Sequence, residues 1–399
     1  MMRLFLNGLA ASSGAGLTYV RNVVPHLSAS ADVQTTVALS PSLRNEFGNP
    51  ANICFLEFEP QGAGQRFWWE QTSLPPLIRR SRADVLISTG NFALRRSPVP
   101  QILLSGNSLY TSSDFYRDLR ARHEYRMWLG THLRGIFAKR SVGWADCTVA
   151  PSEAFAADLR RWTRGNVVSI YHGFDRGAFF RDETPLPATI AQKILPPNGT
   201  LRLLFVSYYN YYRNFETLFR ALPILKGHLK PAKIKLFLTC QLSAGTNPGS
   251  YRTATASRLI RELGIADDVV ELGTVPYHLL HHVYRSCDIY VTAAYAETFA
   301  HPLVEAMASG LPVVASDLPV HREICGAAAV YFPRFSPEHL AEQVLKVACA
   351  ADLARRMGDR GSDRSRDFSW REHVEQIISL ARDLRASTHR KHQIRGHSA

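Results

Sequence analysis

Short apolar runs alternate with longer amphipathic stretches along the whole chain, and this alternation restricts the fold more than any other feature. Strand, helix and strand in succession build a parallel sheet that helices cover. In the first half the strand candidates are residues 4–6, 33–39, 84–88, 101–105, 147–150 and 167–171. In the second half they are residues 201–207, 233–239, 269–272, 289–293, 312–316 and 329–332. The sequence therefore predicts two comparable α/β halves.

The length supports two domains. A chain of 399 residues is longer than one hydrophobic core normally organises, and its apolar content of 46% excludes wholesale disorder. Residues 182–200 combine prolines with polar side chains and favour neither helix nor strand. We expect the domain boundary near residues 180–200, and ligands in a cleft between the two sheets.

The formal net charge of +13 indicates an anionic partner: nucleic acid, acidic lipid or a phosphorylated small molecule. Nucleic acid is the weakest of these, because the basic residues are scattered and no nucleic-acid-binding motif occurs. The six cysteines include no C-x-x-C pair, which favours buried free thiols. No run approaches the roughly 20 apolar residues of a membrane-spanning helix, and the first residues lack a signal-peptide pattern. We therefore expect a cytoplasmic protein.

Residues 294–317, AYAETFAHPLVEAMASGLPVVASD, form the most informative segment. A strand ends there, a loop carries Glu297, and a helix begins at Pro302 with Glu305 in its first turn. The amides around Phe299 to Leu303 and the positive end of the helix dipole would bind an anion, and Glu305 would accept hydrogen bonds from vicinal hydroxyls. The alternative is that Glu305 only complements the dipole and Glu297 is solvated.

The two glutamates are also the residue type of a glycosidase pair. Such carboxylates stand about 5–10 Å apart, whereas eight positions along a continuous helix correspond to about 12 Å. Hydrolysis is therefore disfavoured, although the loop before Pro302 leaves the distance open.

ETFAHPLVE at 297–305 resembles the E-x7-E signature of the retaining nucleotide-sugar glycosyltransferases of family 4. Similar segments occur at residues 147–159, 167–175, 213–222, 271–294 and 368–370. The resemblance implies the α/β fold named GT-B, with two Rossmann-like domains whose parallel sheets face an interdomain cleft. The domains it implies are an acceptor-binding domain over 1–180, a linker over 181–199, a donor-nucleotide domain over 200–369, and a helix over 370–388 that returns to the first domain. Residues 389–399 are expected to be a basic flexible tail.

The resemblance also assigns roles at the donor site. Glu297 is expected to contact the hydroxyls of the donor sugar, and Glu305 to bind the ribose. The backbone of Phe299, Ala300, His301, Pro302 and Leu303 is expected to face the diphosphate. His301 departs from the family, which usually has an apolar residue there, so it is either an added donor or a surface imidazole.

A second departure follows the first strand of the C-terminal half. The family tends to have an arginine and a lysine there, which neutralise the diphosphate, and this sequence has Tyr208 and Arg213. A guanidinium binds phosphate oxygens in a bidentate way, so Arg213 can replace the lysine. Tyr208 offers only a hydroxyl. The alternative for the tyrosines of this run is an aromatic loop packed at the domain interface.

Three further positions follow from the resemblance. Gly14 and Gly16 stand in the family's N-terminal glycine-rich loop, which approaches donor phosphate and acceptor, although by themselves they indicate only a tight turn. Asn107 stands where many relatives have a histidine beside the reacting sugar; an amide orients a hydroxyl but cannot act as a base, and a turn residue is the alternative. The main chain near Val275 is expected to recognise the base.

Residues 115–140 mix arginine with large apolar side chains at helical spacing. This pattern fits a helix packed on the core with a solvated basic side, and it also fits a helix lying on an anionic membrane. Work on lipid-linked acceptors, which is frequent in the family, keeps the second interpretation open.

The sequence therefore predicts a metal-independent glycosyltransferase, since no D-x-D triplet occurs, with no cofactor beyond the nucleoside-diphosphate sugar. Its acceptor would be a glycan or a lipid-linked molecule, with transfer by retention in polysaccharide or glycolipid assembly. Arg213 and Glu297 are the expected catalytic residues. Two alternatives stay open: an epimerase or phosphorylase-like enzyme of the same fold, and a non-catalytic basic protein that binds lipid or nucleic acid.

Overall fold

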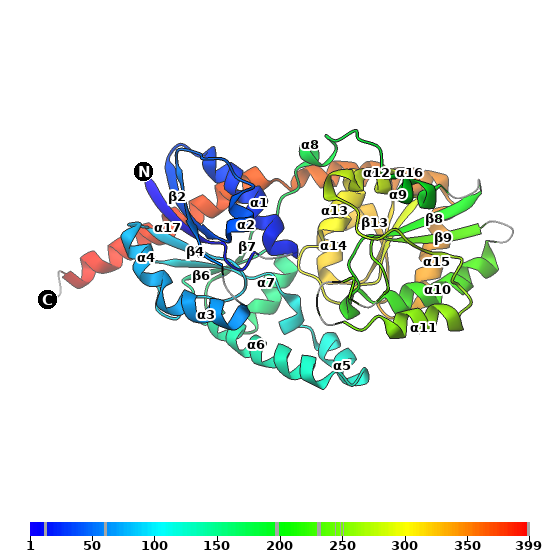
Figure 1. Ribbon diagram of the computed structural model, residues 1–399, viewed down its shortest axis with the longest axis horizontal. Coiled ribbons are helices and arrows are strands. Elements are labelled where there is room, and N and C mark those ends of the chain that lie inside the picture. The colour runs from blue at the N-terminus through cyan, green and yellow to red at the C-terminus, as the bar shows by residue number, and fades with distance from the viewer. Residues whose placement is uncertain are drawn as a thin grey trace. The chain divides into compact units, whose positions relative to one another are not determined.

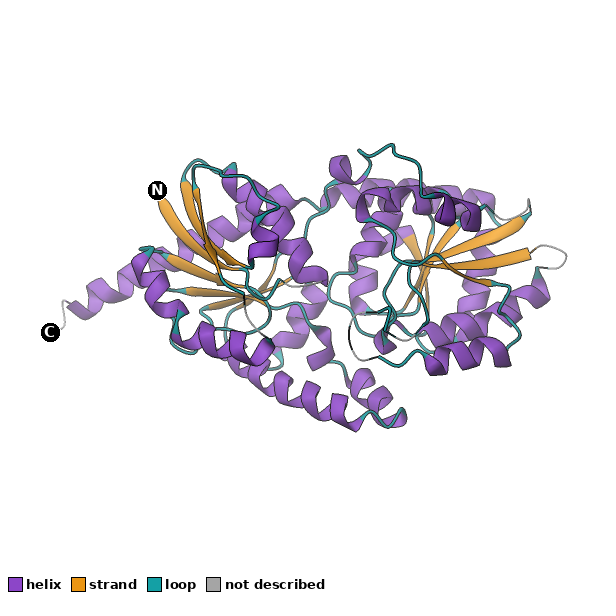
Figure 2. Cartoon of the chain, viewed as in Figure 1, coloured by secondary structure: helices purple, strands orange, loops and turns teal. Residues whose placement is uncertain are grey.

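The structure is a computed structural model that describes residues 1–11, 14–59, 62–195, 199–229, 233–243, 245–247, 249 and 251–396. It divides into two compact units, each with its own parallel sheet (Figures 1 and 2). Unit 1 consists of Met1–Thr111, Glu124–Gly173 and Ser369–Ala399, and unit 2 consists of Ser112–His123 and Phe174–Phe368.

Unit 1 contains a seven-stranded parallel sheet in the order β3-β2-β1-β4-β5-β6-β7. Its strands are Met2–Asn7 (β1), Val33–Leu39 (β2), Ile53–Glu57 (β3), Val85–Ser88 (β4), Gln101–Leu104 (β5), Cys147–Ala150 (β6) and Val167–Ser169 (β7). Strand β3 was not predicted from the sequence. Only Ile53 of this edge strand is buried, and the strand ends in a glutamate, so it lacks the continuous apolar run of a central strand.

The helices of unit 1 cover both faces of this sheet. They are Gly14–Ser28 (α1), Pro41–Arg44 (α2), Ala63–Thr72 (α3), Leu74–Arg80 (α4), Tyr125–Trp144 (α6), Glu153–Arg160 (α7) and Trp370–Gly396 (α17), with a short 3-10 turn at Ser108–Tyr110 (η1). Helix α17 packs along α1 (Figure 1), where Val374 and Ile377 join the core that contains Leu4 and Val20. A Cβ on Gly173 would lie 2.0 Å from the Trp370 backbone nitrogen, so only glycine fits where α17 begins.

Unit 2 contains a six-stranded parallel sheet in the order β10-β9-β8-β11-β12-β13. Its strands are Thr200–Phe205 (β8), Lys233–Leu238 (β9), Val269–Glu271 (β10), Ile289–Thr292 (β11), Val313–Ser316 (β12) and Ala329–Phe332 (β13). Every strand expected from the sequence is present in the two sheets. Because β8, β11 and β12 are adjacent and parallel, the loops that follow them gather at one edge of the sheet.

The longer helices of unit 2 are Ser113–Ala121 (α5), Ala188–Ile194 (α9), Phe215–His228 (α10), Ala254–Glu262 (α11), His301–Ala308 (α13), Pro319–Cys325 (α14), Pro337–Ala348 (α15) and Ala351–Arg364 (α16). Shorter elements are Arg176–Phe179 (α8), Tyr211–Arg213 (η2), Tyr277–Leu279 (η3), Leu280–Arg285 (α12), Gly326–Ala328 (η4) and Ser365–Asp367 (η5). The expectation that residues 182–200 lack regular structure was wrong for α9. Its helix begins after Pro187 and buries Ile190 and Ile194, so the prolines flank the helix and do not interrupt it.

Helix α5 comes from the first half of the sequence, which the sequence analysis assigned to the N-terminal domain, but it packs in unit 2. The Tyr295 hydroxyl donates to Asp118 at 2.6 Å, and the Arg334 guanidinium donates to Asp114 at 2.7 Å. The Phe115 ring lies edge-on to the Tyr212 ring, with centroids 6.2 Å apart. These contacts connect α5 to the loops that follow β11, β13 and β8.

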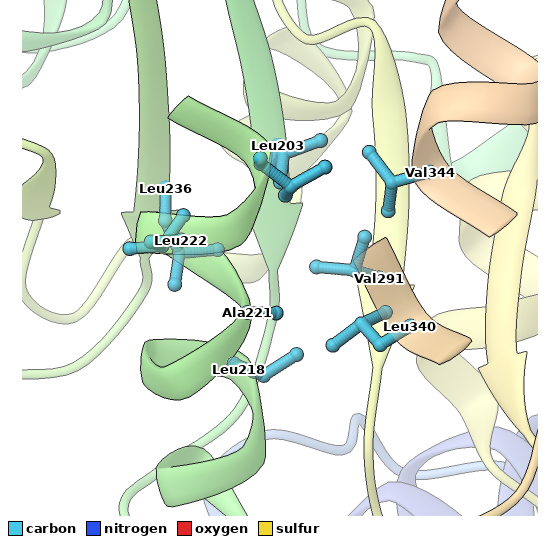
Figure 3. A pocket seen from close by; sticks show the side chains of 9 residues that line it. Leu203, Leu218, Ala221, Leu222, Leu236, Val291, Leu340 and Val344 are labelled. Atoms are coloured by element: carbon cyan, nitrogen blue, oxygen red, sulfur yellow. The ribbon is translucent and has the colours of Figure 1, made fainter. Parts of the chain in front are cut away.

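One part of the core of unit 2 lies between the sheet and helices α10 and α15. Figure 3 shows leucine and valine side chains from both helices and from β8, β9 and β11 around a small void, among them Leu203, Leu222, Val291 and Val344. The void measures about 10 Å³ and its lining is apolar. The apolar lining offers a water molecule no hydrogen-bond partner, and the void is too small for a larger ligand. It is therefore a packing defect and not a ligand site.

Candidate functional site

The loop after β8 is fixed against the end of β11 by one asparagine. Asn214 has a left-handed backbone with φ of 54°. Its side-chain amide donates to the Ala293 carbonyl at 3.1 Å, and its amide oxygen accepts from the Thr217 hydroxyl at 3.0 Å. The Tyr295 amide donates to the Tyr212 carbonyl at 2.9 Å. This network fixes the position of Arg213, which directly precedes Asn214.

Arg213 and Glu297 form a largely buried ion pair, in which a guanidinium N–H donates to the carboxylate. Burial acts to raise the pKa of Glu297, but Arg213, His321 and the Thr298 amide act to lower it, and the net pKa is below the usual value. Burial acts to lower the pKa of Arg213, and Glu297 raises it above the usual value. Both groups are therefore charged at neutral pH. The structure brings together the two residues that the sequence assigned to catalysis.

His321 belongs to the same cluster, and the sequence analysis missed it. Its Nδ1 lies 2.9 Å from the Ser316 carbonyl oxygen, and its buried Nε2 has no hydrogen-bond partner among the described residues. Burial lowers the pKa of His321, although Ser316 and Glu297 oppose this shift. The imidazole is therefore neutral at pH 7. The signal in the sequence was weak: a single histidine in the helix that follows β12.

Helix α13 begins after Ala300, whose φ of 65° is left-handed and turns the chain sharply out of the preceding loop. Among the amides expected to face a diphosphate, that of Leu303 donates to the Ala300 carbonyl at 2.9 Å, and Pro302 has no amide hydrogen. Leu303 and Pro302 therefore offer no free amide hydrogen to an anion.

His301 is partly buried, and its ring centroid lies 4.8 Å from that of Phe299. Burial lowers the pKa of His301 to about 4, against the opposing effect of Glu297. At neutral pH it therefore offers a neutral imidazole and not a positive charge. A neutral ring can still donate one hydrogen bond to an oxygen atom.

Glu305 is buried at 5% exposure and is oriented by tyrosines that the sequence analysis did not identify. The Tyr284 hydroxyl donates to its carboxylate at 2.8 Å. Burial raises the pKa of Glu305 to about 7, although Tyr284 and Tyr277 act to lower it. Glu305 is therefore close to half-protonated at neutral pH. Glu297, the solvated carboxylate of the alternative interpretation, is instead largely buried in its ion pair with Arg213.

Tyr208 and Val275 lie in loops at the same edge of the sheet of unit 2. Tyr208 is 43% exposed, whereas Tyr209 and Tyr211 beside it are buried, so the hydroxyl of Tyr208 is accessible. The Ser207 hydroxyl donates to the Tyr208 carbonyl at 2.7 Å and shapes this turn. Val275 is partly buried in the loop after β10.

The expected residues of unit 1 have plainer surroundings. Gly14 and Gly16 lie in the first turn of α1, and the serines that precede them in the glycine-rich segment are outside the described residues. A Cβ on Gly16 would lie 3.5 Å from the Ala11 Cα, which is an ordinary contact. The Asn107 side chain accepts from the Leu109 amide at 3.1 Å and caps η1, as a turn residue does.

A second buried carboxylate, also missed, lies at the carboxyl end of β1 in unit 1. The Asn7 side-chain amide donates to Glu70 at 3.2 Å, and the Arg66 Nε lies 3.8 Å from the same carboxylate. Burial raises the pKa of Glu70 to about 7, although Arg66 and Asn7 act to lower it. Glu70 comes from α3, and nothing in its local sequence marks it as buried.

The described residues contain neither a metal-binding cluster nor a helix that could span a membrane. No group of three or more histidine, cysteine, aspartate or glutamate side chains within the described ranges has the arrangement that a metal ion requires. In the same part of the chain, no helix is long and apolar enough to cross a membrane.

Two Rossmann-like units, each built on a parallel sheet, define the GT-B fold, and a charged cluster lies at the carboxyl ends of adjacent strands in the second unit. Two family models match the chain: Glycosyltransferase Family 4 over residues 16–177 and Glycosyl transferases group 1 over residues 188–364. The chain therefore belongs to the glycosyltransferases that these two models describe.

Curated relatives are distant. D-inositol 3-phosphate glycosyltransferase from Thermobifida fusca is 26% identical over 249 residues, which is 61% of this chain and 56% of the relative. Mannosylfructose-phosphate synthase from Agrobacterium fabrum is 29% identical over 34% of this chain and 31% of its own length. The chain thus spans about half the length, or less, of the curated relatives it matches.

Solved structures show the same fold over nearly the whole chain. A sucrose-phosphate synthase from Thermosynechococcus elongatus matches with a TM-score of 0.75 and 18% identity, covering 97% of this chain and 100% of that one. Anabaena HepE in complex with UDP-glucose matches with a TM-score of 0.67 and 16% identity, covering 96% and 100%.

Proposed function

We propose that this protein transfers a glycosyl group from a nucleoside-diphosphate sugar to an acceptor hydroxyl, with retention at the anomeric carbon. The acceptor is a glycan or a lipid-linked molecule, in polysaccharide or glycolipid assembly at the cytoplasmic side. The observation that carries the proposal is the buried Arg213–Glu297 pair beside the start of α13. It lies within the segment matched by the group 1 family model.

The charges of the cluster suit departure of a nucleoside diphosphate. The buried Nε of Arg213 has no hydrogen-bond partner among the described residues, so Glu297 leaves part of the guanidinium's donor capacity unused. In this proposal Arg213 stabilises the charge that develops on the diphosphate. Each such donor lowers the activation free energy by about 2.7–4 kcal/mol. Glu297 accepts hydrogen bonds from the donor sugar and keeps Arg213 in place.

The nucleoside is assigned to Glu305 in this proposal. A carboxylate suits the two hydroxyls of a ribose, because it accepts two hydrogen bonds at once. Tyr284 holds one carboxylate oxygen of Glu305 at 2.8 Å, so the orientation is set before a nucleotide arrives. The main chain near Val275 is the proposed contact for the base, and the Tyr208 hydroxyl for the diphosphate.

Glu70 and Asn7 are the proposed residues on the acceptor side, so that Asn107 is not the only residue assigned to the acceptor. A carboxyl group with a pKa of about 7 can accept from or donate to an acceptor hydroxyl near neutral pH. Asn107 is engaged in the cap of η1, so its side-chain oxygen is already in use.

The direct test is incubation with UDP-, GDP-, ADP- and dTDP-sugars, preceded by a thermal-shift screen with the four nucleoside diphosphates. UDP is the first candidate, because a structural neighbour was solved with UDP-glucose. We expect one nucleotide to stabilise the protein and its sugar to be consumed. Failure of every nucleotide to bind, together with no release of nucleoside diphosphate, would contradict the proposal.

Product analysis separates the alternatives. Consumption of sugar nucleotide without an acceptor, giving an isomer or a sugar phosphate, would indicate an epimerase or phosphorylase-like enzyme. Steeply salt-dependent DNA binding without nucleotide affinity would indicate a non-catalytic basic protein. The anomeric configuration of the product, measured by NMR, tests retention.

Metal independence is part of the proposal, because Arg213 supplies the positive charge that a divalent cation supplies elsewhere. We expect the transfer rate in excess EDTA to stay within about twofold of the untreated rate. A rate that falls at least tenfold with EDTA and returns with Mg²⁺ or Mn²⁺ would contradict this assignment.

A further inference from the structure

Helix α6 of unit 1 places its side chains in an unusual way. Its buried residues are small or short: Thr131, Gly135, Ala138, Ser141 and Val142. They recur every three or four positions, so they form one continuous stripe along the helix. A surface helix of a globular protein normally buries its large apolar residues on that stripe.

The large apolar side chains of α6 lie on the other side and are exposed. Their exposed fractions are 53% for Leu129, 49% for Leu133, 39% for Ile136 and 42% for Phe137. At 3.6 residues per turn they form a second stripe, roughly opposite the buried one. Exposed apolar residues that occur singly are ordinary, but an ordered stripe of them marks an interaction surface.

Helix α3 lies beside α6 and extends this surface. The Phe67 ring on α3 contacts the Phe137 ring on α6, with centroids 6.0 Å apart, and the two helices run next to each other in Figure 1. Trp68, also on α3, is 68% exposed. We call the exposed set Trp68, Leu129, Leu133, Ile136 and Phe137 the α3/α6 surface.

The charges of the two helices have one sign. Helix α6 contains no acidic residue and four exposed basic ones, Arg126, Arg134, Lys139 and Arg140. The only acid on α3 is Glu70, which is buried and has a pKa near 7. The nearest acids along the chain are Glu124 and Asp146, at the two ends of α6. Apolar side chains flanked by positive charge match the acyl chains and headgroups of an anionic bilayer.

We propose that the α3/α6 surface docks unit 1 on an anionic lipid bilayer. In the docked state the side chains of Trp68, Leu133 and Phe137 enter the boundary between headgroups and acyl chains. Arg126, Lys139 and Arg140 lie near the lipid phosphates. The proposal is independent of the transfer reaction, because it rests on exposed side chains of α3 and α6, and none of these side chains is assigned above to the donor or the acceptor.

Flotation of the full-length protein with vesicles tests the proposal. We expect binding to phosphatidylcholine vesicles that contain about 30% phosphatidylglycerol, weaker binding at higher ionic strength, and little binding to pure phosphatidylcholine. The triple variant Leu129→Ser, Leu133→Ser, Phe137→Ser replaces exposed side chains and is expected to fold, which circular dichroism verifies. It should bind the anionic vesicles at least tenfold more weakly.

Matched controls separate this surface from general charge and apolar exposure. Arg126→Gln with Arg140→Gln should weaken vesicle binding about 25-fold, since each basic side chain near an anionic surface contributes about a fivefold factor. Arg258→Gln with Arg261→Gln on α11 of unit 2 removes the same charge and should have little effect. Leu195→Ser removes a leucine that is 73% exposed outside the α3/α6 surface and should bind as the unaltered protein does.

Three results would overturn the proposal. One is no binding to anionic vesicles at low ionic strength. Another is binding that the triple serine variant retains in full. The third is that the unaltered protein does not bind vesicles and sediments as a dimer, whereas the triple variant sediments as a monomer. A second copy of the chain would then cover this surface.

Discussion

At the residue scale, the cluster in unit 2 combines one permanent ion pair with groups of adjustable charge. Arg213 and Glu297 are both charged at neutral pH, because each stabilises the charge of the other against burial. Glu305, also buried, accepts a hydrogen bond from the Tyr284 hydroxyl and has a pKa of about 7. The charges of Arg213 and Glu297 are therefore fixed near neutral pH, whereas the charge of Glu305 depends on pH.

Replacing Arg213 should affect catalysis more than nucleotide binding. We expect Arg213→Ala to lower kcat/KM about 100- to 1,000-fold, the usual loss for one oriented donor on developing charge. Arg202→Ala is the control, because Arg202 forms an ion pair with Asp288 in the same unit, at 2.7 Å. It should change kcat/KM less than threefold. Steady-state kinetics with the preferred donor measure both variants, and an equal loss in both would remove Arg213 from the site.

Nucleotide affinity should depend on the ionisation of Glu305. Because the ionised carboxylate accepts the ribose hydroxyls, the affinity for a nucleoside diphosphate should fall as pH drops through about 7. Tyr284→Phe removes a hydrogen bond that lowers the pKa of Glu305, so the midpoint should move to higher pH. Calorimetric titrations from pH 5.5 to 8.5 measure this. Glu305→Gln controls for titration of the phosphate itself and should lose the part of the pH dependence due to Glu305.

Glu70 should make unit 1 less stable at high pH. Its folded-state pKa, about 7, lies above the ordinary 4.5, so the folded state binds a proton that the unfolded state releases between these values. The contribution of Glu70 to the free energy of unfolding is fully present below about pH 4.5 and is lost as the pH rises through 7. Glu70→Gln should therefore stabilise unit 1 at pH 8, by about 1 kcal/mol or more, with little gain at pH 5. Urea unfolding of both proteins at pH 5 and pH 8 measures this difference. An equal effect of the substitution at the two pH values would contradict the assigned pKa.

At the scale of elements, α13 is held in place by close packing against α16. A Cβ on Gly358 of α16 would lie 2.4 Å from the Gly310 carbonyl oxygen, and one on Gly361 would lie 3.1 Å from the Met307 side chain. The two helices therefore approach at backbone distance. This contact holds the C-terminal end of α13, the helix that begins directly after Ala300.

Gly358→Ala should destabilise unit 2 by roughly 1–3 kcal/mol, because the new methyl group overlaps a backbone oxygen that cannot move freely. Gly227→Ala on α10 is the matched control. Nothing lies within 4 Å of its Cβ position, so alanine should stabilise the helix by about 0.5–1 kcal/mol. Thermal unfolding followed by calorimetry measures both. Equal shifts of Tm in the same direction would contradict the role of this contact.

At the scale of the whole molecule, the sequence predicted the architecture well and the site in part. Buried parallel strands are continuous apolar runs, so both sheets were predictable, apart from the half-polar edge strand β3. The resemblance to family 4 pointed to Glu297 and Glu305 in the signature segment and to Arg213 in place of the family's lysine, and the structure pairs Arg213 with Glu297. His321, Tyr284 and Glu70 were missed, because their importance comes from burial beside residues distant in the chain. The packing of α5 in unit 2 was missed for the same reason, since its contacts are to Tyr295 and Arg334.

The division into units also predicts where a nucleotide protects the backbone. Every residue proposed to hold the donor, apart from the glycines of α1, lies in unit 2. Hydrogen–deuterium exchange with the nucleotide bound should therefore slow most at residues 211–214 and 297–305. Residues 125–144 of α6 should exchange at an unchanged rate. Slowing confined to unit 1 would contradict the placement of the donor site.

The chain passes from one unit to the other four times, at residues 111–112, 123–124, 173–174 and 368–369. During synthesis, unit 2 therefore has all of its residues once Phe368 has left the ribosome, whereas unit 1 still lacks α17. Helix α17 fills the core beside α1, so the unit that begins first is completed last. A nascent chain stalled before Trp370 would present a finished second half attached to a first half with an open apolar groove, the form on which a chaperone would act.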